Sequence, residues 1–184
     1  MQATKRDPVN VYSGERIINV ANLQVDDVDI DEIALALAHL CRYNGHMKSF
    51  YSVAEHCIYV SKRVELMALK MGATPEQAQA DALAGLMHDA AEAYIGDIVY
   101  PLKHSGMFDD YLALEEEIEA VITRAFELSP INAELVKIVD ADITNWEKAI
   151  FREYTLREAP SSEAVQKAYL RRFHNLTSNR WSKW

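Results

Sequence analysis

The apolar residues of this chain recur mainly at the three- and four-residue spacing of amphipathic helices, which predicts a helical domain. The first helix is expected to begin at Asp29 or Asp31, either of which can cap it, and to continue through residues 33–43. A second helix should begin at Ser52, where the run SVAE forms a capping box, and stop at Gly72. Its apolar stripe, which we expect to be buried, consists of Val53, Cys57, Val60, Val64 and Met67.

A third helix is predicted to begin at Thr74, since TPEQ combines a cap, a first-turn proline and a closing glutamine. No breaker follows until Gly96, so we expect this helix to run that far and to carry His88 and Asp89. The pair Tyr100-Pro101 then predicts a connector.

Further helices are predicted in the second half of the chain. A long amphipathic helix should cover residues 108–128, with the acidic run 115–117 as a solvated face. The next is expected to begin after Ser129-Pro130, and a last amphipathic helix over residues 161–176 should close the bundle.

Residues 1–28 differ from the rest because they predict an irregular segment with a short hairpin. Two β-prone runs flank Ser13-Gly14, a turn signal. We therefore divide the chain into this segment, a helical domain over 29–176 and a tail over 177–184.

Composition fits one folded domain of 184 residues, with 49% hydrophobic and 26% charged residues. No apolar run approaches the roughly 20 residues of a membrane span, and the N-terminus lacks the apolar core of a signal peptide. Cys41 and Cys57 are too few for a disulfide framework, which favours a reducing cytoplasm. The net charge of −9 argues against nucleic-acid polymers as partners but leaves room for a small anionic substrate.

The stretch from Asp81 to Lys103 carries the most distinctive chemistry. On the predicted helix, Asp89 and Glu92 share one face with His88, among apolar residues that should be buried. Such groups are costly to bury without partners, so they need a cation or a hydrogen-bond network.

Two other helices offer metal-capable side chains. His56 lies at the edge of the second helix's stripe, where a lone histidine is more often a core residue than a ligand. Asp142 falls inside the predicted apolar stripe of the next-to-last helix, whereas Asp140 should point away beside Glu147. That stripe consists of Leu135, Ile138, Val139, Trp146, Ala149 and Ile150.

Together, two imidazoles and two carboxylates suit a divalent transition metal or Mn²⁺, with positions left for water and substrate. Ligands without a thiolate point away from a closed structural zinc site and towards a hydrolytic one.

The pattern H…HD…D, carried by His56, His88-Asp89 and Asp142, resembles the HD-domain metal-dependent phosphohydrolases. The phrases RYNGH…YSVAEH and HDAAEAYIGD…PLK are similar to those of the 5′-deoxynucleotidase-like branch, which includes phage and prophage members. The resemblance covers about Asp29 to Leu176 and implies an all-α bundle of HD type.

The resemblance also implies roles for particular residues. His56, His88, Asp89 and Asp142 would hold one divalent ion (Mn, Co, Zn, Fe or Mg). Glu92 and Asp97 would be catalytic, Glu92 by handling a proton. Arg42 and Lys103 would bind phosphate oxygens, although Lys103 can equally be a free surface lysine.

The activity implied is release of phosphate from deoxynucleoside 5′-monophosphates by attack of a metal-bound water. One alternative is a deoxynucleoside triphosphate triphosphohydrolase, which needs more cations. Another is a non-catalytic helical module with a structural metal. The resemblance further implies a nucleotide as small-molecule partner, a homo-oligomer (dimer or higher), and the cytoplasm, that of the host if the chain is phage-encoded.

Overall fold

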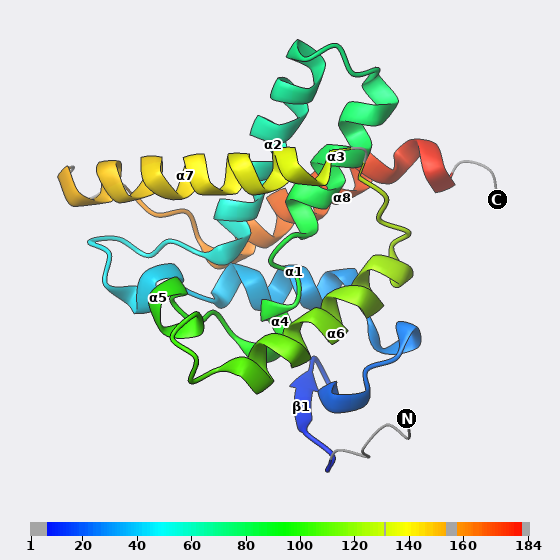
Figure 1. Cartoon of the computed structure of the whole chain (residues 1–184), viewed down its shortest axis with the longest axis vertical. Helices are drawn as coiled ribbons and strands as arrows, with labels where there is room; N and C mark the ends of the chain where they lie inside the picture. Colours follow the sequence, from blue (N-terminus) through cyan, green and yellow to red (C-terminus); the bar gives the residue numbers. More distant parts are fainter. Residues whose placement is uncertain (1–6, 131, 154–157, 182–184) are drawn as a thin grey trace.

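A computed structural model describes residues 7–130, 132–153 and 158–181 (Figure 1). Helices dominate it, and one antiparallel hairpin precedes them, which confirms the predicted all-α class with a short N-terminal hairpin. In chain order the elements are β1 (Asn10–Ser13), β2 (Arg16–Asn19), η1 (Val20–Asn22), η2 (Val25–Asp27), α1 (Ile30–His39), η3 (Arg42–Gly45), α2 (Val53–Lys70), α3 (Pro75–Met87), α4 (Glu92–Ile95), α5 (Tyr100–Lys103), α6 (Asp109–Ala125), α7 (Ala133–Glu153) and α8 (Ser162–Trp181).

The first three long helices begin where the sequence predicts caps. The Asp29 side chain accepts a hydrogen bond from the amide of Asp31 at 2.8 Å and caps α1. At the start of α2, the Ser52 hydroxyl accepts from the Glu55 amide at 3.2 Å, and the Glu55 carboxylate accepts from the Ser52 amide at 3.3 Å. The capping box at Thr74 is also complete. These bonds satisfy amides that the first helical turn leaves without partners.

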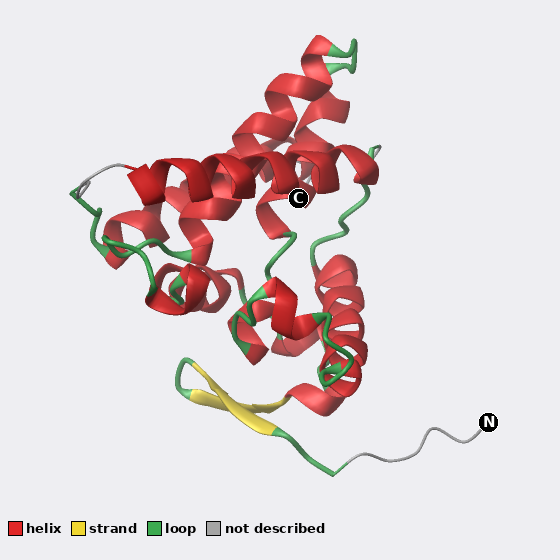
Figure 2. Ribbon diagram, turned by 60° about the vertical axis from the view of Figure 1, so that its left-hand side comes forward, coloured by secondary structure: helices red, strands yellow, loops and turns green. Residues whose placement is uncertain are grey.

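Helices α2 and α3 form a hairpin that projects from the body, and α7 crosses it (Figures 1 and 2). The main core lies between α1, α2, α3, α4, α6 and α8. A smaller apolar cluster joins the hairpin to α7 and consists of Val60, Val64, Ala68, Ala78, Leu135, Val136 and Val139. This second cluster fixes which face of α7 turns inward.

The helix predicted to carry His88 ends earlier than expected. Helix α3 stops at Met87, and residues 88–91 form a turn before α4 begins. In that turn the Glu92 amide donates to the Asp89 carbonyl at 3.0 Å. The hydrogen bond thus reaches the third preceding residue, as in a 3₁₀ turn, and not the fourth, as in an α-helix. The expectation that His88 and Glu92 share one face of a continuous helix is therefore wrong.

Two smaller expectations also fail. The segment predicted as a connector contains the short helix α5. In the acidic run, Glu116 and Glu117 are exposed as predicted, but Glu115 is only 7% exposed and lies 2.6 Å from the Lys103 ammonium. This ion pair joins residues twelve positions apart, so helical periodicity gives no sign of it.

At the C-terminal end, α8 continues to Trp181, so the tail proposed for residues 177–184 begins inside a helix. Within the described part of the chain, no helix combines the length and the apolar character needed to span a membrane.

Candidate metal centre and adjoining cavities

Side chains from α2 and from the turn after α3 meet in the interior. Ligand atoms of His56, His88 and Asp89 lie within 4.8 Å of one another. The two histidine Nε2 atoms are 3.3 Å apart, and His88 Nε2 is 3.2 Å from Asp89 Oδ1. The structure thus brings together these three predicted ligands, and the tight turn at residues 88–91 presents both His88 and Asp89 to His56.

Both imidazoles are oriented by a bond at Nδ1. His56 Nδ1 lies 2.7 Å from Glu147 Oε1, and His88 Nδ1 lies 3.0 Å from the Gly85 carbonyl oxygen. Because a carboxylate and a carbonyl only accept, each Nδ1 carries the proton. Both rings therefore turn Nε2 towards the centre, the atom that a metal would take.

Asp140 supplies the second carboxylate, and the prediction that Asp142 lies on the inward face is wrong. Asp140 Oδ1 lies 2.9 Å from His56 Nε2 and 3.7 Å from His88 Nε2. Asp142 is exposed on α7. We refer to His56, His88, Asp89 and Asp140 as the His–Asp cluster.

The error at Asp142 comes from the phase assigned to α7. Val136 and Val139 pack against the α2–α3 hairpin, whereas Ile138 and Trp146 are 48% and 44% exposed. The predicted buried stripe therefore includes apolar residues that face outward. The true inward face carries Val136, Asp140, Thr144 and Glu147, the set that the apolar pattern places outside.

The charges within the cluster call for a cation. Burial raises the pKa of Asp89, but the neighbouring His88 outweighs it, so that pKa lies well below its usual range. Burial acts likewise on Asp140, and hydrogen bonds from His56 and His88 lower its pKa overall. For His88, burial favours the neutral ring, yet Asp89 and Asp140 hold its pKa well above the ordinary value. The carboxylates thus demand positive charge, and two nitrogens with two carboxylates fit a divalent transition metal.

A cavity of about 660 Å³ opens beside the cluster. Its acidic and basic lining residues come from several segments of the chain: Arg42, Asp89, Glu92, Asp97, Lys103, His104, Asp140 and Lys148. The predicted catalytic and substrate-binding residues thus share one cavity with two members of the cluster. A volume of this size suits a small-molecule ligand.

Glu92 is the most perturbed carboxyl group in that cavity. It is 8% exposed, and within the described structure its buried Oε2 has no hydrogen-bond partner. Burial, reinforced by the charges of Asp89 and Asp97, raises the pKa of Glu92 from 4.5 to about 10. Burial also raises the pKa of Asp97. Glu92 therefore holds a proton at neutral pH, as an acid catalyst must.

The two predicted phosphate ligands are both held by carboxylates. Arg42 lies 3.5 Å from Asp89 and 3.3 Å from Glu147, and its Nη2 donates to Thr144 at 3.3 Å. Lys103 pairs with Glu115 and is not a free surface lysine. Both remain at the cavity wall, where an anionic ligand would meet them.

Glu147, His104 and Lys148 are site residues that sequence reasoning missed. Glu147 stands seven positions after Asp140 on the inward face, so the correct helical phase would have found it. The exposed His104 and Lys148 carry no local signal, because only the fold brings α5 and α7 to the same cavity.

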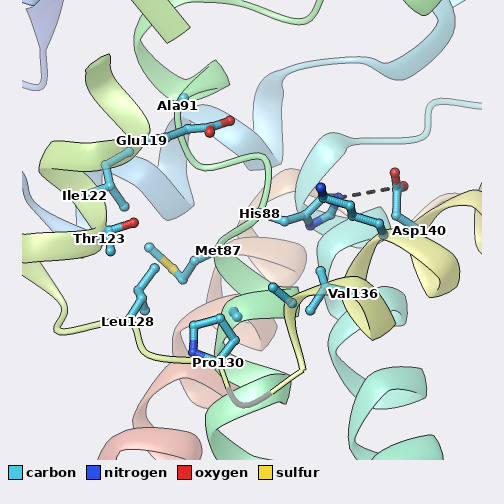
Figure 3. Close-up of a pocket in the computed structure, with 13 residues that line it drawn as sticks. Met87, His88, Ala91, Glu119, Ile122, Thr123, Leu128, Pro130, Val136 and Asp140 are labelled. Atoms are coloured by element: carbon cyan, nitrogen blue, oxygen red, sulfur yellow. Dashed lines mark ion pairs between the residues drawn. The ribbon is translucent and has the colours of Figure 1, made fainter. Parts of the chain in front are cut away.

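A second cavity, of about 500 Å³, also reaches the cluster (Figure 3). His88 and Asp140 lie at one end of it, while Met87, Ile122 and Leu128 contribute to a largely apolar wall. Among its described lining residues, Lys137 is the single lysine or arginine. The larger cavity is therefore the better match to a phosphate group.

Comparison with known proteins identifies related chains. The family described as HD domain matches residues 53–172, more than half of the chain, including the whole His–Asp cluster. Uncharacterized protein YfdR of Escherichia coli (strain K12) is 36% identical over 132 residues, and uncharacterized protein RCAP_rcc00048 of Rhodobacter capsulatus is 35% identical over 129 residues. These matches cover 72% and 69% of this chain but 65% and 62% of the relatives, so the chain spans less than two thirds of their length.

Proposed function

The chain belongs to the HD domain family, and on that premise we propose that it releases phosphate from deoxynucleoside 5′-monophosphates. Proteins with this domain are metal-dependent hydrolases. The proposal of a nucleotide substrate rests on the resemblance of the HDAAEAYIGD segment to the 5′-deoxynucleotidase-like branch and on one structural observation. The His–Asp cluster borders a cavity in which Arg42 and Lys103 stand together with the buried Glu92.

The cluster would hold the metal through Nε2 of His56 and His88 and the carboxylates of Asp89 and Asp140. A divalent cation there supplies Lewis-acid chemistry, since it neutralises phosphoryl charge and makes water more acidic. The surrounding protein keeps these four side chains in place before any ligand arrives, and preorganised charge contributes strongly to transition-state stabilisation.

Arg42 is suited to bind the phosphoryl group. Its guanidinium can present two parallel N–H donors to two phosphate oxygens, which fixes orientation as well as charge. Its side chain is 12% exposed, so the contact would form in a largely dry environment where it is stronger. Lys103 adds a second positive charge at the same cavity.

Glu92 would transfer a proton to the oxygen of the leaving nucleoside, because its raised pKa keeps the proton on the carboxyl until it is needed. Asp97, half-buried in the same cavity, would position a water or a sugar hydroxyl. This division assigns proton transfer to one carboxyl group and orientation to the other.

One observation favours triphosphohydrolase activity as a second candidate function. His104 and Lys148 line the cavity in addition to Arg42 and Lys103. A triphosphate chain needs more cationic partners than a single phosphate does, and these residues could supply them.

A substrate panel tests the proposal. Purified protein is incubated with nucleoside and deoxynucleoside mono-, di- and triphosphates and with Mn²⁺, Co²⁺, Zn²⁺, Fe²⁺ or Mg²⁺ in turn, and the released product is identified. We expect orthophosphate from deoxynucleoside monophosphates, and none with a chelator or in His88→Asn. Triphosphate release would favour the second candidate, and absence of turnover with every substrate would overturn both.

A further inference from the structure

Glu147 is a fully buried carboxylate on α7 at the base of the site. Its Oε1 lies 2.6 Å from the Tyr51 hydroxyl and 2.7 Å from His56 Nδ1. Its Oε2 accepts from the Tyr43 hydroxyl at 2.7 Å and forms an ion pair with Arg42 Nε at 3.3 Å. An unpaired buried carboxylate would be very costly, whereas here both oxygens are fully engaged.

The partners of Glu147 belong to two different parts of the site, the candidate metal centre and the cavity beside it. His56 is a member of the His–Asp cluster, and Arg42 faces the cavity proposed for the phosphate group. We propose that Glu147 is a positioning residue that holds His56 ready for a cation and Arg42 ready for phosphate at the same time. This inference rests on the proposed function for the meaning of the phosphate site.

The contact with His56 sets the direction of the imidazole. Glu147 accepts a hydrogen bond from Nδ1, so Nε2 is the ring nitrogen that faces His88 and Asp140. Outer partners of this kind fix the ring and increase the basicity of the ligand nitrogen, and their loss typically weakens metal binding by ~10–100-fold.

The contact with Tyr43 sets the position of the segment that carries Arg42. Tyr43 and Asn44 in η3 have φ angles of 57° and 52°, in the left-handed region that non-glycine residues seldom adopt. Such conformations persist where surrounding contacts over-determine them. The Tyr43 hydroxyl bond to Glu147 is one of these contacts, so Glu147 holds Arg42 directly and through the strained turn.

Two equilibrium measurements that need no turnover test the inference. Mn²⁺ affinity of the metal-free protein and orthophosphate affinity of the Mn²⁺-saturated protein are measured by titration calorimetry. In Glu147→Gln we expect Mn²⁺ affinity to fall by ~10–100-fold and orthophosphate affinity to fall as well. Glu147→Asp should recover part of both, since it keeps the charge.

Tyr51→Phe is the matched control, because it removes a hydrogen bond from the same carboxylate but keeps the Glu147 side chain that contacts His56 and Arg42. It should lower the melting temperature yet leave both affinities within a few-fold of wild type. Tyr43→Phe should weaken orthophosphate but not Mn²⁺, and it tests the inference even if Glu147→Gln fails to fold.

Wild-type affinities in a folded Glu147→Gln would overturn the inference, and so would equal losses of affinity in Tyr51→Phe. The proposed function fails independently, if the wild-type protein binds Mn²⁺ and orthophosphate but hydrolyses no nucleotide.

Discussion

Oδ1 of Asp140 lies 2.9 Å from Nε2 of His56, a contact that joins α7 to α2 at the His–Asp cluster. The histidine presents Nε2 because Glu147 occupies its other nitrogen. Asp140 is therefore aimed at the atom that a metal would use. This relationship brings α7 to the candidate metal centre through Asp140, and not through Asp142 as the sequence pattern suggested.

The first prediction concerns these two aspartates. Loss of a residue that only hydrogen-bonds to a metal ligand typically weakens metal binding by ~10–100-fold. Asp140→Asn should weaken Mn²⁺ binding by more than this, because it removes a charged oxygen from the cluster itself. Asp142→Asn should leave the affinity unchanged, since Asp142 is exposed. Calorimetric titration of both metal-free variants gives the comparison. The opposite ranking would restore the predicted phase of α7 and contradict the structure.

The second prediction separates metal binding from proton transfer at Glu92. Glu92→Gln should reduce kcat by ~10²–10⁴-fold, the usual effect of losing a positioned acid or base, while the metal content stays near wild type. Glu116→Gln, an exposed change on α6, is the control and should retain full activity. If Glu92→Gln lost metal to the same extent as Asp89→Ala, Glu92 would be a ligand and Asp97 the next candidate for the acid.

The third prediction uses the raised pKa of Glu92 in metal-free protein. With a folded pKa of about 10 against 4.5 in the unfolded chain, the native state holds a proton that the unfolded state has lost at neutral pH. Unfolding therefore releases a proton, and this group's contribution to stability is complete below pH 4.5 and lost as pH rises towards 10.

Glutamine cannot ionise, so Glu92→Gln should gain stability relative to wild type, and the gain should grow between pH 5 and pH 9. Urea unfolding of both proteins in chelator at pH 5, 7 and 9 measures the difference, with Glu116→Gln again as control. Parallel pH profiles for wild type and Glu92→Gln would mean that Glu92 is ionised in the native protein.

Much of the fold can be predicted because the signals are local. The capping boxes at Ser52 and Thr74 depend on residues three positions apart, so the sequence alone locates the starts of α2 and α3. Within α2, the apolar spacing correctly indicates that His56 lies against the buried stripe. Local patterns are consequently enough to identify His56, His88 and Asp89 as metal-capable residues of the interior.

The sequence-based predictions fail at the inward face of α7 and at the end of α3. Ile138 and Trp146 are apolar but face outward, because the inward face of α7 is set by its packing against the α2–α3 hairpin. The break after Met87 falls at His88 and Asp89, and neither glycine nor proline marks it in the sequence. On α7 tertiary packing overrides the apolar pattern. Both errors misplace side chains of the candidate metal centre that helical periodicity alone had positioned.

The fourth prediction tests whether Arg42 binds the phosphoryl group. Arg42→Lys keeps the charge but removes the planar pair of donors, and it weakens the contacts with Glu147 and Asp89. We expect KM for a deoxynucleoside monophosphate to rise by roughly tenfold, which corresponds to about 1.4 kcal/mol of lost interaction. Mn²⁺ affinity should change much less than in Asp140→Asn, because Arg42 donates no electron pair to a metal.

The matched control is Arg63→Lys, on the exposed face of α2, which should leave KM unchanged. Steady-state kinetics with each variant at saturating Mn²⁺ distinguish a rise in KM from a fall in kcat. If Arg42→Lys lowered kcat alone, the guanidinium would act only in the transition state. If neither constant moved, the phosphate would have to be bound by Lys103, His104 or Lys148, the other basic side chains in the described wall of the cavity.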